Sequence, residues 1–167
     1  IARVLARFQG VQRRFQILGT FGGVTVVDDY AHNPSKVKAA IHAARTGGAR
    51  RVIAVFQPHR YTRTKFLAHE FEGAFEEADV LLVTDIYAAG EPPIVGVKAD
   101  IILDGVRRHG APTRVHHTPG HREVCEFLVQ ECEPGDVVIA LGAGDIGQCA
   151  RSLESYLGNP ALKRAAI

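Results

Sequence analysis

Three short runs rich in Val, Ile and Leu constrain the fold of this 167-residue chain more than any other feature. They are Val52–Phe56, Val80–Ile86 and Val137–Leu141. A strand that is buried on both faces is apolar along its whole length, and such strands are typical of parallel sheets covered on both sides. The sequence therefore predicts a sheet whose central strands have no solvent-exposed face.

Segments with helical periodicity lie between these runs. In Pro34–Ala44, apolar residues recur every three or four positions, and Asn33 stands where an N-cap is expected. Further helices are predicted at 1–10, 64–78, 99–108, 122–130 and 146–157. In the second of these, Phe66, Leu67, Phe71 and Phe75 are expected to face the core. Alternation of strands and helices predicts right-handed βαβ units.

The N-terminal part breaks this alternation. Arg14–Leu18 and Val24–Asp28 are predicted to be strands joined by a glycine-rich turn, and Arg114–His116 is predicted to be a short strand. The fold class that we expect is therefore α/β. It is a three-layer, Rossmann-like, mostly parallel sheet with helices on both faces and an N-terminal antiparallel strand or hairpin.

The composition gives no reason to expect a nucleic-acid or membrane partner. The net charge is only +2, no block of Lys and Arg occurs, and no apolar run approaches the roughly 20 residues of a membrane span. The three cysteines form no CxxC pair, which predicts buried, reduced thiols and a cytoplasmic protein. His116, His117 and His121 are not expected to bind a metal, because neighbouring strand residues point to opposite faces.

Ligands of such sheets bind at the carboxyl ends of the parallel strands, so we expect the functional residues in the loops after the strands. The first loop opens a helix, whose N–H groups and dipole favour an anion. Asp28 and Asp29 could hold a cation or ribose hydroxyls, and His32 and Asn33 could bond to phosphate or base. The alternative is that one acid and Asn33 only cap the helix.

The second loop follows the first buried strand and carries His59, Arg60 and Arg63. Their mutual repulsion at a helix start costs stability until an anion arrives. The planar fork of Arg suits carboxylate or phosphate. The alternative is that these are solvated arginines paired with Glu70 or Glu72.

The remaining two loops are less specific. Asp85 and Glu91 could recognise an ammonium group, or could belong to a simple loop shaped by its small residues and prolines. Gly142–Gly147 has the GxGxxG spacing of a dinucleotide site. That fingerprint belongs to the first βα unit, with an acid about 20 residues later, so a close-packed turn is the alternative.

These loops resemble the Mur ligase family, and within it the members that add L-alanine. The match at residues 56–64 is the most specific, whereas that at 28–34 is similar to a motif shared more widely across the family. The segments that carry the resemblance are FQGVQRRF (8–15), DDYAHNP (28–34), FQPHRYTRT (56–64), TDIYAAGE (84–91) and GAGDI (142–146). Together they span nearly the whole chain, roughly residues 7–157.

The resemblance implies the C-terminal domain of a ligase that joins L-alanine to UDP-N-acetylmuramate, with ATP and Mg²⁺ as cofactors. It implies a linker from a central ATPase domain at 1–10, the C-terminal domain at 11–158 and a flexible tail at 159–167. Nucleotide binding is implied for Asp28, Asp29, His32 and Asn33. Substrate binding is implied for Tyr30, His59, Arg60, Arg63, Asp85, Tyr87 and Glu91. No residue of this domain is assigned as catalytic or as a metal ligand.

One departure limits what this chain can do alone. The family's ATPase needs a GxxxxGK[ST] loop, and none occurs in these 167 residues. The chain is therefore expected to be inactive by itself and to hold no cofactor tightly. Three alternatives stay open: another amino-acid or murein-peptide ligase of the family, a free-standing phosphoester- or nucleotide-binding α/β domain, and an NAD-binding module.

Overall fold

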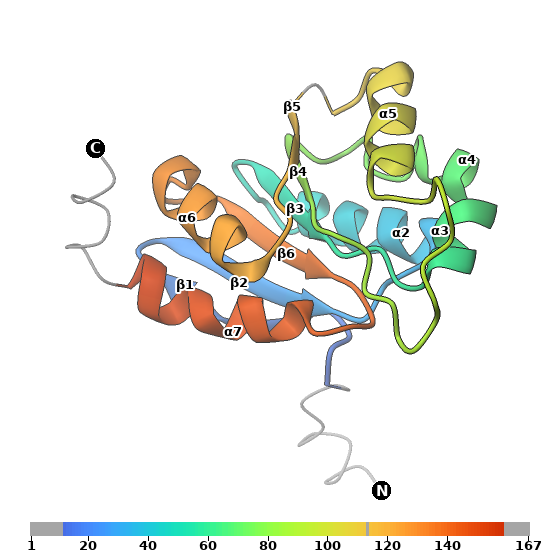
Figure 1. Cartoon of the computed structure of the whole chain (residues 1–167). Coiled ribbons are helices and arrows are strands. Elements are labelled where there is room, and N and C mark those ends of the chain that lie inside the picture. The colour runs from blue at the N-terminus through green and yellow to red at the C-terminus, as the bar shows by residue number, and fades with distance from the viewer. Residues whose placement is uncertain (1–11, 113, 159–167) are drawn as a thin grey trace, which may run out of the picture.

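The computed structural model describes residues 12–112 and 114–158. Within this part, one sheet has the strand order β1-β2-β6-β3-β4-β5 (Figure 1). Strand β1 is antiparallel to β2, and the other neighbouring pairs are parallel. The strands are β1 (Gln16–Phe21), β2 (Val24–Asp29), β3 (Val52–Phe56), β4 (Val80–Val83), β5 (Arg114–His117) and β6 (Val137–Leu141). The predicted fold class is confirmed.

Helices cover both faces of the sheet (Figure 1). They are α2 (Pro34–Thr46), α3 (Tyr61–Phe66), α4 (Ala68–Phe71), α5 (Asp100–His109), α6 (His121–Glu131) and α7 (Ile146–Leu157). Strand β3 shows how the layers share one strand. Val52, Ala54 and Phe56 pack with α2, α4 and α5, whereas Ile53 and Val55 pack with α6 and α7. The apolar runs are thus continuous because both faces of the sheet are buried.

Helix α2 forms as its sequence predicts. Asn33 is its N-cap, and the side-chain oxygen of Asn33 accepts a hydrogen bond from the backbone N–H of Lys36 at 3.1 Å. Pro34 occupies the first turn, where a missing N–H has no cost. The buried residues Val37 and Ile41 lie on the face that packs on the sheet. This start places the loop after β2 at the positive end of a helix of 13 residues.

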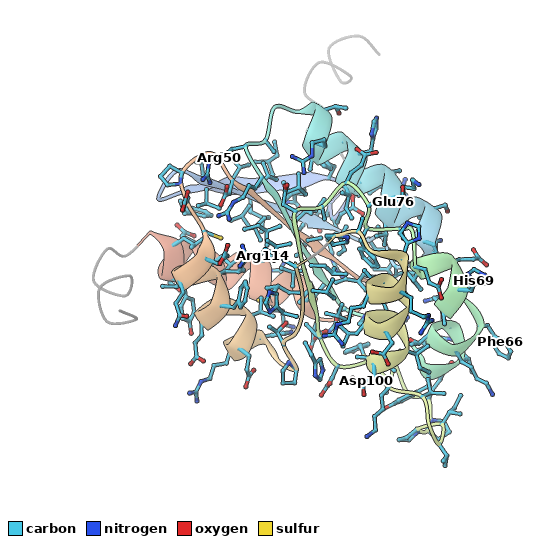
Figure 2. All side chains as sticks on the ribbon, turned by 90° about the horizontal axis from the view of Figure 1, so that it is seen from above. Arg50, Phe66, His69, Glu76, Asp100 and Arg114 are labelled. Atoms are coloured by element: carbon cyan, nitrogen blue, oxygen red, sulfur yellow. The ribbon has the colours of Figure 1, made fainter. Side chains whose placement is uncertain are left out.

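The single helix predicted over 64–78 is wrong. The chain forms α3 and the four-residue α4, with the break at Leu67, and continues in turns. Phe66 is 77% exposed and points outward from α3 (Figure 2), while Phe71 and Phe75 are buried as expected. The break rotates the later residues relative to the earlier ones, so a continuous 3.6-residue period does not apply across it.

Two strands differ from their predicted limits by more than one residue. Strand β4 ends at Val83, before the predicted Ile86, because the chain leaves the sheet after Thr84 donates to the carbonyl of Phe56. Strand β1 begins at Gln16 and extends to Phe21, past the predicted end at Leu18. Phe15 has a positive φ of 45°, which is not a strand conformation. The helix predicted at 1–10 and the tail at 159–167 lie outside the described residues.

Cys125, Cys132 and Cys149 are buried, as predicted. In residues 12–112 and 114–158, no helix combines the length and the apolar character that crossing a bilayer requires.

Candidate functional site

Four loops meet at the carboxyl edge of the sheet, where β2, β6 and β3 end side by side (Figure 1). Backbone hydrogen bonds continue beyond the strands and fix these loops to one another. Gly142 N–H donates to Asp29 at 3.1 Å, and Gln57 N–H donates to Leu141 at 2.9 Å. We call this surface the loop face; it comprises residues 28–33, 57–63, 84–91 and 142–145.

A row of four rings crosses the loop face. The ring centroids of Tyr30 and His32 are 5.2 Å apart, those of His32 and His59 5.9 Å, and those of His59 and Tyr87 5.7 Å. The last two rings are nearly parallel, with 18° between their planes. Tyr30 and Tyr87 remain 46% and 38% exposed. Side chains from three separate loops, all predicted as site residues, therefore form one continuous surface, which we call the ring row.

The predicted cationic residues border this row. Arg63 Nη1 lies 3.0 Å from His59 Nδ1, so the guanidinium donates to that nitrogen and leaves the other ring nitrogen to carry the proton. Arg60 has a positive φ of 70° and approaches Glu91 only at 4.0 Å. Glu72 binds Arg108 at 2.9 Å, not the arginines of this loop. The arrangement therefore favours the anion-binding interpretation over paired surface arginines.

The surroundings of both histidines of the ring row disfavour their protonation, because they lower the pKa of each ring. Burial, and after it the positive charge of Arg63, lowers the pKa of His59 below its ordinary value of 6.5. The pKa of His32 is also lowered, first by burial and then by the charges of Arg63 and Lys36, against a hydrogen bond to the carbonyl of Tyr30. An anion placed among these groups would reverse the charge effect. The positive charges around these rings would therefore be favourable to an anion.

The two acids predicted to bind nucleotide are already in use. The Asp28 side chain is fully buried and lies 3.4 Å from Arg13 Nε and 3.5 Å from Arg151 Nη1. Asp29 accepts backbone N–H bonds from Phe15 at 2.6 Å and Ala31 at 2.7 Å. Both carboxylates thus hold the loop in shape. Nucleotide binding by either acid stays a prediction, as it does for the N-cap Asn33.

Sequence reasoning missed Arg13, which connects two of the loops. Its guanidinium donates to the carbonyls of Gly142 at 2.6 Å and Gly144 at 3.2 Å, and lies 5.1 Å from the centroid of the Tyr30 ring. The only signal was the adjacent pair Arg13-Arg14 at the start of the domain. Nothing in that pair indicated a partner about 130 residues away along the chain.

The predicted site residues of the third loop, residues 84–91, lie in different surroundings. Tyr87 belongs to the ring row, and its backbone exchanges hydrogen bonds with Pro58 and Arg60 at 2.8 Å each. Glu91 accepts from Thr62 N–H at 3.0 Å and from its hydroxyl at 2.7 Å; these hydrogen bonds lower the pKa of Glu91. Asp85 pairs with His117 at 2.8 Å and lines a pocket of about 690 Å³.

Protein atoms fill the space beside the glycines of the fourth loop. A Cβ on Gly144 would lie 2.4 Å from Gln57 and 2.6 Å from the ring of Tyr87, and one on Gly147 would lie 2.6 Å from Asp28. The spacing therefore reflects close packing, which supports the turn interpretation over a dinucleotide cradle. In the described residues, no group of three His, Cys, Asp or Glu side chains could hold a metal ion.

Comparisons with known proteins agree with these motifs. A family model for the Mur ligase, glutamate ligase domain matches residues 13–144. The UDP-N-acetylmuramate–L-alanine ligase of Sorangium cellulosum is 51% identical over 162 residues, covering 93% of this chain and 34% of that protein. The chain thus spans about a third of the length of the curated relatives it matches.

Solved structures show the same architecture. The UDP-N-acetylmuramate-alanine ligase of Thermotoga maritima superposes with a TM-score of 0.72 at 26% identity, over 92% of this chain and 31% of that one. A murein peptide ligase of Psychrobacter arcticus gives a TM-score of 0.75 at 18% identity, over 94% and 32%. With a family model that covers most of the chain and a relative that shares half of its residues, this chain belongs to the Mur ligase family.

Proposed function

We propose that this chain is the C-terminal domain of an ATP-dependent ligase that joins L-alanine to UDP-N-acetylmuramate in the cytoplasm, for peptidoglycan synthesis. The observation that carries this proposal is the loop face, where His59 lies close to the positive charges of Arg60 and Arg63 at the carboxyl edge of the sheet. Its motifs occur in a chain that is 51% identical to a ligase of this activity. Because the chain spans a third of such proteins, the ATPase and UDP sites are proposed to lie on the remainder.

The residues of the loop face suit a supporting role in this reaction. Arg60 and Arg63 would donate to a substrate carboxylate or phosphate, and the second ring nitrogen of His59 can donate to the same anion. The exposed ring of Tyr30 offers a flat apolar surface for a base or sugar. When a central domain covers the loop face, water leaves and these charge-assisted hydrogen bonds become stronger.

The two expected cofactors, ATP and Mg²⁺, differ in how well they fit this domain. ATP supplies the energy of ligation when bound, and the cationic loop face fits its phosphates. Mg²⁺ does not fit the described residues, because Asp28 is paired with two arginines and both oxygens of Asp29 accept backbone N–H groups. We therefore assign no step in this chain to a metal ion. The same engagement of the acids argues against a free-standing, metal-dependent phosphoesterase.

A chimeric ligase tests the proposal. This chain would replace the matching C-terminal third of the Sorangium cellulosum relative, and product formation would be followed by mass spectrometry with UDP-N-acetylmuramate and ATP. We expect ligation of L-alanine above that of glycine or L-serine. Preference for a murein tripeptide would move the chain to the recycling branch of the family. A folded chimera that ligates neither would contradict the proposal, and the unmodified relative is the control.

A further inference from the structure

Gln57 is buried at the base of the loop face, and both ends of its amide form a hydrogen bond. The residue is only 6% exposed. Its Nε2 donates to Asp145 Oδ1 at 2.7 Å, and its Oε1 accepts from the backbone N–H of Ile146 at 3.2 Å. The first bond involves a charged acceptor and is of the stronger class. One side chain thus ties the loop after β3 to the loop after β6, 88 residues later.

Asp145 has a second partner from a third segment. His121, the first residue of α6, places Nε2 3.2 Å from the same Asp145 Oδ1. The carboxylate oxygen therefore receives Gln57 from one side and His121 from the other. We call these three side chains the amide clamp. It lies at the point where two loops and a helix start converge.

Besides the chain itself, Gly144 connects the amide clamp with the ring row. Gly144 lies between Gln57 and Tyr87, because a Cβ built on it would be 2.4 Å from Gln57 Oε1 and 2.6 Å from the Tyr87 ring. The Tyr87 ring also stacks with the His59 ring, at a centroid distance of 5.7 Å. The order of contact is thus Gln57, Gly144, Tyr87 and His59, which leads from the buried amide to the anion site. A displacement of Gln57 is transmitted along close contacts.

We propose that Gln57 is a positioning residue that sets the place of Tyr87 and His59 through Gly144, with Asp145 and His121 holding its amide. This inference rests on the proposed function, in which Tyr87 and His59 contact the substrates. It assigns to a buried amide a role that its sequence neighbours in FQPHRYTRT do not reveal.

The chemistry of the clamp requires an amide at this position. A glutamate would keep the acceptor for Ile146 N–H but would place a second negative oxygen beside Asp145 at the present 2.7 Å. Two carboxylates at that distance repel and move apart. An asparagine at 145, with its amide nitrogen in place of Oδ1, could donate one N–H to such a glutamate and the other to Nε2 of a neutral His121. The two changes together therefore restore both the bonding and the original charge.

The test is a cycle of three variants: Gln57→Glu, Asp145→Asn and the pair combined. Each is compared with Gln148→Glu, which adds the same charge on the exposed side of α7. Backbone and imidazole NMR signals of the 167-residue chain report the positions of Gly144, Tyr87 and His59. Steady-state kinetics in the chimeric ligase report KM for the amino acid separately from kcat.

We expect Gln57→Glu to move the three sets of signals and to raise KM about tenfold or more, the loss expected for a hydrogen bond to a charged group. Asp145→Asn should have a small effect, and the combined variant should return both readouts toward the original values. The inference is overturned if the combined variant matches Gln57→Glu, or if Gln57→Glu behaves like Gln148→Glu. If the chimera never ligates L-alanine, the proposed function fails, and the NMR signals of the chain alone still decide the role of Gln57.

Discussion

The ring of His59 contacts three different side chains. Its ring stacks on Tyr87, faces His32 at a centroid distance of 5.9 Å, and accepts from Arg63 through Nδ1. These contacts fix the tautomer of the ring and aim its remaining N–H, because a guanidinium can only donate. A residue that was expected only to hold substrate thus also has a defined protonation state and orientation. Two predictions follow from this geometry.

The first prediction concerns proton uptake. The folded-state pKa values of His32 and His59 are lowered from 6.5 by burial and by the charge of Arg63. Without an anion, stability is therefore lost as the pH falls through 6.5 toward these pKa values. A bound anion should raise both pKa values, so sulfate, which does not titrate in this range, should bind more tightly as the pH falls from about 7 to 5.5.

NMR titration of the imidazole signals with and without sulfate measures this directly. In Arg63→Gln without sulfate, the pKa of His59 should rise, because one of its lowering causes is removed. Equal pKa values with and without sulfate at saturation would show that the histidines do not face the anion.

The second prediction concerns Arg63 in catalysis. Arg63→Ala in the chimeric ligase should lower kcat/KM about 10- to 100-fold, as expected for a lost charge-assisted contact worth about 1.5–3 kcal/mol. Arg122→Ala is the matched control, because Arg122 is 80% exposed and pairs only along its helix with Glu126. Equal values of kcat/KM for the two variants would show that Arg63 is a solvated surface charge.

Sequence reasoning could find the members of the ring row because strand ends converge on one edge, whatever the details of packing. Tyr30, His59 and Tyr87 each follow a buried strand, and that position alone brings them together. Arg13 and Gln57 could not be found in this way. Their partners lie about 90 to 130 residues distant, and such contacts depend on the folded arrangement of the glycine loop.

At the scale of elements, α3 and α4 show that the spacing of apolar residues does not predict where a helix breaks. The break at Leu67 exposes Phe66 while Phe71 packs against Phe56 and Phe75 at centroid distances of 5.0 and 6.2 Å. Arg60, the N-cap of α3, and Arg63, within α3, both belong to the loop face. The strands β3 and β6 were predicted with their full limits, because burial on both faces leaves an unambiguous run.

Two identical substitutions test this break. Phe71→Ala should lower the free energy of unfolding by about 3–5 kcal/mol, because it empties a packed aromatic cluster. Phe66→Ala should change it by about 0.5 kcal/mol or less, because the ring is 77% exposed. Urea unfolding followed by circular dichroism gives both values. Similar losses in the free energy of unfolding at the two positions would contradict the break and favour a single continuous helix.

At the scale of the whole molecule, the two edges of the sheet differ in how far their charges are satisfied. At the amino edge, Arg51 binds Asp136 at 2.7 Å and Glu131 at 2.9 Å, and Arg50 binds Asp136 at 3.0 Å. At the carboxyl edge, Asp28 is paired with Arg13 and Arg151, whereas Arg60 reaches Glu91 at 4.0 Å and Arg63 contacts the ring of His59. Within the described residues, the arginines of this edge are thus unequally paired, and Arg60 and Arg63 are the ones that we propose to bind an anion.

This asymmetry predicts the behaviour of the chain in isolation. With an anion site but no GxxxxGK[ST] loop in its sequence, the chain should show no ATP-dependent ligation of L-alanine. Release of phosphate from ATP, with UDP-N-acetylmuramate and L-alanine present, is the measurement, and the chimeric ligase is the positive control. Turnover by the chain alone above a no-enzyme blank would contradict the division of labour proposed for this domain.

The ring row has an optical consequence. The chain contains no tryptophan, and two of its four tyrosines, Tyr30 and Tyr87, stand at the two ends of the row. Their phenol emission is sensitive to an adjacent imidazolium or to a base laid across the rings, whereas Tyr156 of α7 packs against the core and contributes a steady background. The unlabelled protein thus carries its own ultraviolet reporter of what occupies this surface.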